Sequence, residues 1–439
     1  MRRIPITHPT AVRTLIFLVA LMPALAAGDS ATINLATALR LAGAKPLDLE
    51  LARNSLRQAE ANYAETRNKF FPWFTVGAGY HRLDGNTQDV AGNITGVSKQ
   101  SYQAGLGVVA ELRLGEAVYQ SIAAKQRAAA AGHAVESVRQ DLLAAVSAGY
   151  FDLLRAQAEL QVNEQSKSLA ADYATQVTAA VAAGVVFEAD QYRAQAQVLR
   201  HELSTRKALE EIQVASARLC ELLRLPHGLD LRGVDAELVP LDLLPPDASL
   251  GSQVRQALDH RPELRSREAL LEAARSDSRA AIKGPLIPDL SLRANTGGLG
   301  GGKNDSTGNF GASSEFLFGV GWRIGPGGLF DQARTESARA AEETESILLE
   351  KARLRISREV LEAMARVRSI SSRLTTTRKL LEVSEKAYHL SRERGATGVC
   401  GVLETLLAEE DLSFARLAWF GLVADYNKAQ STLRRAIGR

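Results

Sequence analysis

The chain contains few of the residues from which covalent or metal-centred sites are built. Its 439 residues include only two cysteines, Cys220 and Cys400, and both stand in segments of helical pattern. The sequence therefore predicts no disulfide framework, although an exported protein would permit a single bond. The seven histidines are scattered, and no serine–histidine or paired-carboxylate arrangement stands out. We expect no metal, no cofactor and no enzyme activity.

Apolar runs long enough to form a membrane helix are also lacking. The one candidate, residues 14–25, is too short to span a bilayer, and it follows three arginines. The small-x-small tripeptide Ala24-Leu25-Ala26 comes at its end. These features predict that residues 1–26 are a secretory signal peptide. No cysteine follows the expected cleavage site, so we expect an exported chain without a lipid anchor.

A charge excess of one sign is lacking as well. The formal net charge is +3, and residues 1–26 hold three arginines and no acid, so the mature chain is expected to be neutral. Acids and bases are spread along the helical segments, as solvated faces require. A surface for nucleic acid is therefore not predicted.

The sequence does contain an internal duplication. Each half has an apolar helix, a proline (Pro72 or Pro288), two alternating segments around a polar loop, and two very long alanine-rich helices. Three residues of the first half stand 214 positions before their equivalents in the second: Gly184, Asp190 and Ala194 before Gly398, Glu404 and Ala408.

Four segments within residues 73–114 and 289–325 alternate with period two, which predicts strands. Their polar loops are expected near Asp84–Gln100 and Thr296–Gly311. One face of each strand is apolar, and the other is mostly glycine and small polar residues. The pattern is compatible with a barrel whose apolar face meets lipid, and equally with a soluble sheet packed on the helices.

If these strands enter a membrane, the chain must form an oligomer. Unpaired strand edges are too costly in hydrocarbon, and four strands cannot close into a barrel by themselves. Several chains would then share one barrel. Four aromatic residues are candidates for its interfacial girdle: Tyr80, Tyr102, Phe316 and Trp322.

The helical segments are unusually long. The segment from Glu116 to Ala183 contains no proline, and at 1.5 Å per residue it could reach about 100 Å. Further helices are expected up to Leu223 and over residues 333–393 and 403–437. Apolar residues follow a three-four rhythm, which is typical of helices packed side by side. Helices of this length are expected to pair within the chain and then pack against other chains.

The ordered set of these features resembles the TolC family of outer-membrane efflux channels. The resemblance runs from about Ile33 to Ile437 and includes Ala38-Leu39 in the opening helix and both prolines before the strands. It also includes Gly325–Phe330, where strand returns to helix, and the turns at residues 183–186 and 397–399. No single motif is specific, but their order is.

The resemblance implies a fold that combines membrane β-structure with long helices. In a homotrimer, each chain would give four strands to a twelve-stranded β-barrel in the outer membrane. A periplasmic α-helical barrel would continue it. The implied domains are a first repeat over residues 27–224, a linker over residues 225–250 against the waist of the barrel, and a second repeat over residues 251–439.

The implied function is that of an exit duct in a tripartite efflux or type I secretion system. The passive channel would dock to a periplasmic adaptor protein and an inner-membrane pump. The docking tips would be the helix breaks, formed by Gly184, Val185, Val186, Gly398 and Val399. The transported substrate, whether drug, metal ion or polypeptide, is not determined by the sequence.

Two acids near the tips, Asp190 and Glu404, match the family's gate carboxylates. Rings of acid at a constriction would favour cations. The chain departs from the family where Cys400 replaces a basic residue and Leu407 replaces a second acid. Arg193 or Arg394 could supply the missing cation, and the alternative interpretation of both acids is an ordinary solvated helix face.

Two other interpretations compete with the duct. The long helices could form a periplasmic scaffold, with the strands as soluble sheets. An enzyme has support only from Gly297–Lys303, which is almost a phosphate-binding loop. However, Asn304 stands where the serine or threonine is needed, so we expect a mobile external loop instead.

Overall fold

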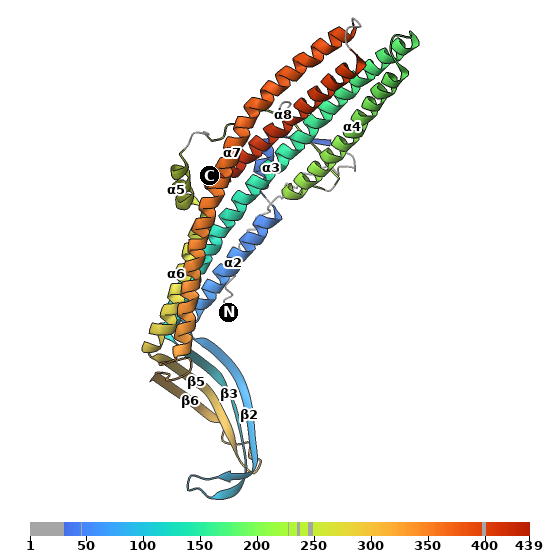
Figure 1. Cartoon of the computed structure of the whole chain (residues 1–439). Coiled ribbons are helices and arrows are strands. Elements are labelled where there is room, and N and C mark those ends of the chain that lie inside the picture. The colour runs from blue at the N-terminus through green and yellow to red at the C-terminus, as the bar shows by residue number, and fades with distance from the viewer. Residues whose placement is uncertain (1–29, 45, 227, 235–237, 245–248, 397–400) are drawn as a thin grey trace, which may run out of the picture.

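The computed structural model describes residues 30–439 apart from residues 45, 227, 235–237, 245–248 and 397–400. The expected signal peptide, residues 1–26, lies outside the described residues. The molecule is long and narrow, with a curved sheet at one end and long helices running away from it (Figure 1). Within the described ranges, none of the helices is both long enough and apolar enough to cross a membrane.

Both halves of the chain run through the same order of helices, strand hairpin and two long helices. The first half contains β1 (Ser30–Ile33), α1 (Leu35–Ala42), α2 (Leu47–Asn68), β2 (Trp73–Gln88), β3 (Ile94–Leu112), α3 (Leu114–Ala182) and α4 (Glu188–Leu223). After β4 (Asp230–Gly233), the second contains α5 (Leu250–His260), α6 (Pro262–Lys283), a 3-10 turn (Gly284–Leu286), β5 (Asp289–Lys303), β6 (Gly311–Gly321), α7 (Gln332–Ala396) and α8 (Val402–Ala436). The ends of the long helices fall within three residues of the ranges that the sequence predicts.

Local residues set where several helices begin. The side chain of Asn34 accepts a hydrogen bond of 2.8 Å from the backbone N–H of Thr37, which caps α1. Helix α6 begins with Pro262, whose missing N–H is not needed in the first turn. Before α7, the carboxylate of Asp331 accepts hydrogen bonds from the backbone N–H groups of Gly327 and Arg334. It thereby fixes the return from strand to helix.

The helices form one curved layer. Near the sheet the neighbours are α2, α3, α6 and α7, and farther away they are α4, α3, α8 and α7. Thus α3 and α7 run the full length, while α2 and α4 follow one another along one side of α3. The main core lies where Val146 and Tyr150 of α3 meet Leu219 of α4 and Val423 of α8, all fully buried. The abundant alanines let neighbouring helix backbones approach closely.

A small parallel ribbon at mid-length was not predicted from the sequence. Strand β1 pairs with β4, Ala31 opposite Leu231. The chain after β4 is held to α8, because the side-chain amide of Asn427 donates to the carbonyl of Val239 and accepts from the N–H of Leu241. The segment that the sequence assigns to a linker therefore lies against the helices through specific hydrogen bonds.

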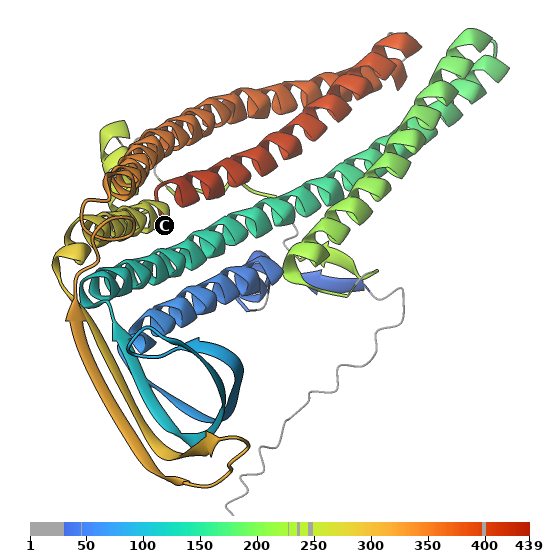
Figure 2. The same cartoon turned by 90° about the horizontal axis from the view of Figure 1, so that it is seen from below.

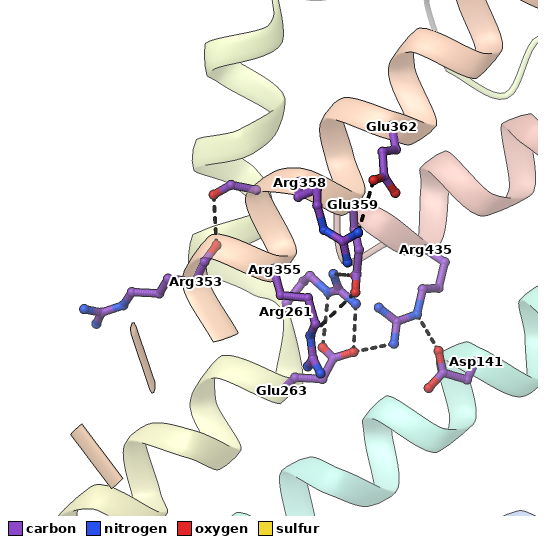
Figure 3. Close-up of polar contacts among 10 residues, drawn as sticks. Asp141, Arg261, Glu263, Arg353, Arg355, Arg358, Glu359, Glu362 and Arg435 are labelled. Atoms are coloured by element: carbon purple, nitrogen blue, oxygen red, sulfur yellow. Dashed lines mark hydrogen bonds and ion pairs between the residues drawn. The ribbon is translucent and has the colours of Figure 1, made fainter. Parts of the chain in front are cut away.

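A network of ion pairs joins four helices near the C-terminus (Figure 3). Arg261, between α5 and α6, is 2% exposed and contacts Glu263 and Glu359. Arg435 of α8 contacts Glu263 and also Asp141 of α3, the latter at 2.5 Å. Burial raises the pKa of the Asp141 carboxyl above its ordinary value, and the charge of Arg261 opposes that rise. The network therefore ties α3, α6, α7 and α8 together at one level.

The sheet is antiparallel throughout, in the order β2-β3-β5-β6. At the loop end, the strands are longer than the alternation predicts. The loops comprise only residues 89–93 and 304–310. The longer loops expected near Asp84–Gln100 and Thr296–Gly311 were therefore wrong. Pairing continues through threonine, serine and glycine because ladders need only backbone groups. At the other end, β3 stops at Leu112 and β6 at Gly321, short of the predicted hairpin ends.

The segment Gly297–Lys303 belongs to strand β5 and pairs with β3 over its whole length. A phosphate-binding loop needs a helix directly after its lysine, and here a turn follows instead. Both the nucleotide-binding hypothesis and the expectation of a mobile loop over these residues are therefore wrong.

The sheet bends strongly along its length (Figure 2). Gly105 and Gly297 stand opposite each other in the register. A Cβ atom added to either would run into the backbone of the other strand. The two backbones thus converge on this face, which makes it concave, and glycine provides the needed space.

Candidate functional site

Two helical hairpins end side by side at the tip farthest from the sheet (Figure 1). Helix α3 ends in a Schellman motif: Gly184 has φ +71°, and the N–H of Val185 donates to the carbonyl of Ala180 at 2.9 Å. This motif needs a left-handed residue at Gly184, so the glycine break seen in the sequence has a defined role. The equivalent positions Gly398, Val399 and Cys400 lie outside the described residues.

The first tip presents apolar side chains to solvent. Val185 and Phe187 are 76% and 83% exposed, whereas Val186 turns toward a small cluster that contains Val177 and Ala194. Sequence reasoning singled out Val185 and Val186 but missed Phe187, although a phenylalanine three residues after a break glycine is a visible signal. The tip therefore offers an apolar projection.

The two candidate gate acids each pair with an arginine of their own hairpin. Asp190 lies 2.9 Å from Arg193, one turn further along α4. Glu404 of α8 lies 3.2 Å from Arg394 at the end of α7. Both arginines proposed from the sequence as substitute cations are thus in contact with the acids. Such partly exposed pairs contribute at most about 1 kcal/mol each, so they can rearrange readily.

Leu407, which stands where the family has a second acid, is about half exposed on α8. It contributes an apolar side chain on the helix of Glu404 instead of a charge. The candidate gate charges at this tip are therefore those of Asp190, Glu404 and their two arginines.

A buried polar cluster below the tip was missed by sequence reasoning. His201 of α4 lies 3.0 Å from Glu409 of α8, and the side-chain amide of Gln197 donates to the same carboxylate at 2.9 Å. The sequence pattern did contain a sign of this cluster. One buried row of α4, with three-four spacing, consists of Ala194, Gln197, His201 and Ala208. Two polar residues in an apolar seam indicate a polar contact across it, and here that contact joins the two hairpins.

The four girdle candidates lie at different levels of the sheet. Tyr80 and Tyr102 are direct cross-strand partners at mid-length of the β2–β3 hairpin, and Tyr102 lies close to the end of β5 and the loop that follows it. The ring of Tyr102 also stacks on Phe310, with centroids 5.9 Å apart, and sequence reasoning did not select Phe310.

Phe316 is exposed within β6, and Trp322 lies just beyond it, donating to the carbonyl of Leu286 at 3.3 Å. The tyrosines thus lie near the level where β5 ends, and Trp322 lies at the helical end of the sheet. A girdle at both membrane interfaces remains a prediction.

Neither metal nor thiol chemistry is indicated by the described residues. In that part of the chain, no group of three or more His, Cys, Asp or Glu side chains could hold a metal ion. Cys220 is buried and free, and burial raises the pKa of its thiol. Its side chain donates to the carbonyl of Leu229, as a structural cysteine does.

Comparison with known proteins gives a family and a fold. The model of the family described as outer membrane efflux protein matches residues 38–223 and 254–439. No curated protein matches the chain.

Several solved structures are similar along almost the whole chain. A membrane protein from Pseudomonas aeruginosa is 22% identical with a TM-score of 0.80, covering 92% of this chain and 93% of its own. The CmeC outer membrane channel of Campylobacter jejuni is 18% identical with a TM-score of 0.78, covering 92% and 85%. The open state of the Neisseria gonorrhoeae MtrE outer membrane channel is 21% identical with a TM-score of 0.75, covering 92% and 89%. At these identities the likeness shows the fold, and it confirms the fold class that the sequence predicts.

Proposed function

The chain belongs to the outer membrane efflux protein family, and from this membership we infer that it is the exit duct of an export system. Its sheet would lie in the outer membrane and its long helices in the periplasm. The observation that carries this proposal is that the sheet and the helical layer are both open along the same two sides of the chain. They require further copies of the chain to complete both parts.

The edges of the sheet are the first support for an oligomer. Among the described strands, β2 pairs only with β3, and β6 pairs only with β5. One face of the sheet is apolar and exposed, for example at Phe74, Val76 and Phe318. Open edges cannot remain in hydrocarbon, so β6 of one copy must pair with β2 of the next. Three copies would supply twelve strands, an even number within the range of closed membrane barrels.

The helical layer is open along the same sides. Helix α7 exposes Ile347, Leu354 and Leu361, which recur every seven residues. On the opposite side, α4 exposes Leu199 and Leu203. Heptad spacing of exposed apolar residues suits side-by-side packing with another helix. A head-to-tail contact between these sides would repeat from copy to copy, as the ring of the proposed homotrimer requires.

The tip is the proposed docking and gating region. Exposed Val185 and Phe187, with the second tip at Gly398 and Val399, would meet a periplasmic adaptor protein that is bound to an inner-membrane pump. Asp190 and Glu404 would line the entrance and be held by Arg193 and Arg394. Because each pair is weak and lies within one hairpin, the acids are free to take other partners when neighbouring hairpins move.

The function is tested by reconstituting the purified protein. We expect it to fractionate with outer membranes, to run as a heat-modifiable trimer on gels, and to conduct ions in planar bilayers. A protein that stays in the periplasmic fraction and conducts nothing would instead be a helical scaffold, which would overturn the duct.

Removing both gate acids should open the entrance. In the variant Asp190→Ala with Glu404→Ala, we expect conductance to rise on the order of twofold and selectivity to shift from cations toward anions. The carboxylate charge at the entrance would be lost, while the arginine charge would remain. Single-channel conductance and the reversal potential in a salt gradient measure both effects.

The matched control is Glu210→Ala, which removes an exposed acid of α4 away from the tip. It should leave both quantities unchanged. Unchanged conductance in the double variant would mean that these acids are ordinary surface residues.

A further inference from the structure

The concave face of the sheet carries two adjacent lysines at the level where strand β5 ends. Lys99 and Lys303 are direct partners in the register between β3 and β5, and both are exposed. Lys303 is the last residue of β5, so the pair lies where β5 ends, while the hairpin of β2 and β3 continues beyond it to Gln88 and Ile94. Cross-strand partners have Cβ atoms only about 5 Å apart, so two like charges are held close together.

On the concave face of the described sheet, no acid stands beside this pair. Asp305, two residues after Lys303, and Asp84 share the cation of Arg82, whose side chain belongs to the opposite, apolar face. Asp89, ten residues before Lys99, accepts hydrogen bonds from the backbone N–H groups of Ala91 and Asn93 in its own loop.

On the concave face itself, the next acids are Glu315 and Glu111. Glu315 is level with Asn295 of β5, about 26 Å from Lys303 at the rise of a strand. Glu111 is about 40 Å from Lys99 along β3. Both distances exceed the screening length in physiological salt. The lysine charges therefore act on the solution in front of them.

The surroundings of the pair leave room for a ligand. The residues of this face between the lysines and the middle of the sheet are small or uncharged, including Ser101, Gly301 and Gln103. Two ammonium groups at this separation can both donate to the oxygens of one phosphoryl or carboxylate group. Like charges directly opposite one another destabilise a sheet, and a bound anion would remove that cost.

We propose that Lys99 and Lys303 form a binding site for multivalent oxyanions at the outer mouth of the channel. The inference rests on the proposed trimeric duct, in which the concave face lines the lumen and three lysine pairs form one ring. Rings of charged side chains set the selectivity of pores. This ring attracts solutes that bear phosphoryl or carboxylate groups to the exit.

The test uses the full-length channel in planar bilayers of phosphatidylcholine, with sodium tripolyphosphate as the probe. Added on the side of the strand loops, tripolyphosphate should block the current at lower concentration than when added on the helical side. In the variant Lys99→Gln with Lys303→Gln, the concentration for half block should rise at least about tenfold. Lys99→Arg with Lys303→Arg should keep the block.

The control Lys351→Gln removes an exposed lysine of α7, and tripolyphosphate should block this variant as it does the unaltered channel. The single variants Lys99→Gln and Lys303→Gln should give intermediate block, so the result does not depend on the double variant folding. Equal block of conducting channels with and without the lysines would overturn the site but not the duct. An absence of any channel would overturn the duct itself.

A final comparison separates a soluble anion from a lipid headgroup. If the lysines face the lumen, adding phosphatidylglycerol to the bilayer should leave the tripolyphosphate block unchanged. Loss of the block in that anionic lipid would place the lysines at the membrane surface and overturn the lumenal site.

Discussion

The variant Arg261→Met should unfold more easily than the unaltered protein by on the order of 3 kcal/mol. The guanidinium of Arg261 is almost fully buried, and its loss leaves the carboxylates of Glu263 and Glu359 without their shared cation. The penalty is moderated because Arg435 still contacts Glu263, and because Glu359 is about one third exposed and still lies 3.6 Å from Arg355. The helical circular dichroism of the purified trimer, followed against temperature or denaturant, measures the change.

Two further variants test whether the loss of a buried charge causes the destabilisation by Arg261→Met. Arg358→Met removes a cation from an exposed pair with Glu362, so we expect a loss below about 1 kcal/mol. Adding Glu359→Met to Arg261→Met removes one of the two carboxylates that lost Arg261 and should recover part of the stability. If Arg261→Met and Arg358→Met lost the same amount of unfolding free energy, the buried network would stabilise the protein no more than an exposed ion pair does.

The variant Gly297→Ala should fail to assemble a stable barrel. The added methyl group would overlap the carbonyl of Ala104 and the Cα of Gly105 on the facing strand. Backbone atoms in the centre of a sheet cannot move aside without breaking the pairing between β3 and β5, which joins the two halves of the chain. The amount of protein in the outer membrane and its heat-modifiable gel mobility measure the defect.

The control for this prediction is Gly311→Ala at the start of β6, where an added Cβ meets no atom within 4 Å. That variant should assemble as the unaltered chain does. Normal assembly of Gly297→Ala would show that the sheet is less curved than the structure indicates.

Patterns within short segments predicted much of the architecture. A three-four rhythm without proline indicates a helix wherever it occurs, so the ends of α3, α4, α7 and α8 could be placed closely. Gly184 was recognised as a break because a helix that ends in a left-handed residue favours glycine there. Alternation likewise located the four strands, since side chains of a strand point to opposite faces in turn.

The same reasoning failed where alternation was weak. Strand β5 continues through Gly297, Gly298 and Gly300 to Lys303, although glycines show no apolar period. The rings of Phe310 and Tyr102 lie over Gly298 and Gly300, so these glycines are covered by side chains from elsewhere. A segment whose packing is supplied by its neighbours carries little evidence of strand structure in its own sequence.

The sequence by itself determined the duplicated order of helices and strands and the positions of the tip acids, because these depend on residues close together along the chain. Only the tertiary structure decided which charges meet. Arg261 with Glu359, His201 with Glu409, and Lys99 with Lys303 are separated by about one hundred residues or more. Their proximity depends on how helices and strands align, and no local period contains that information.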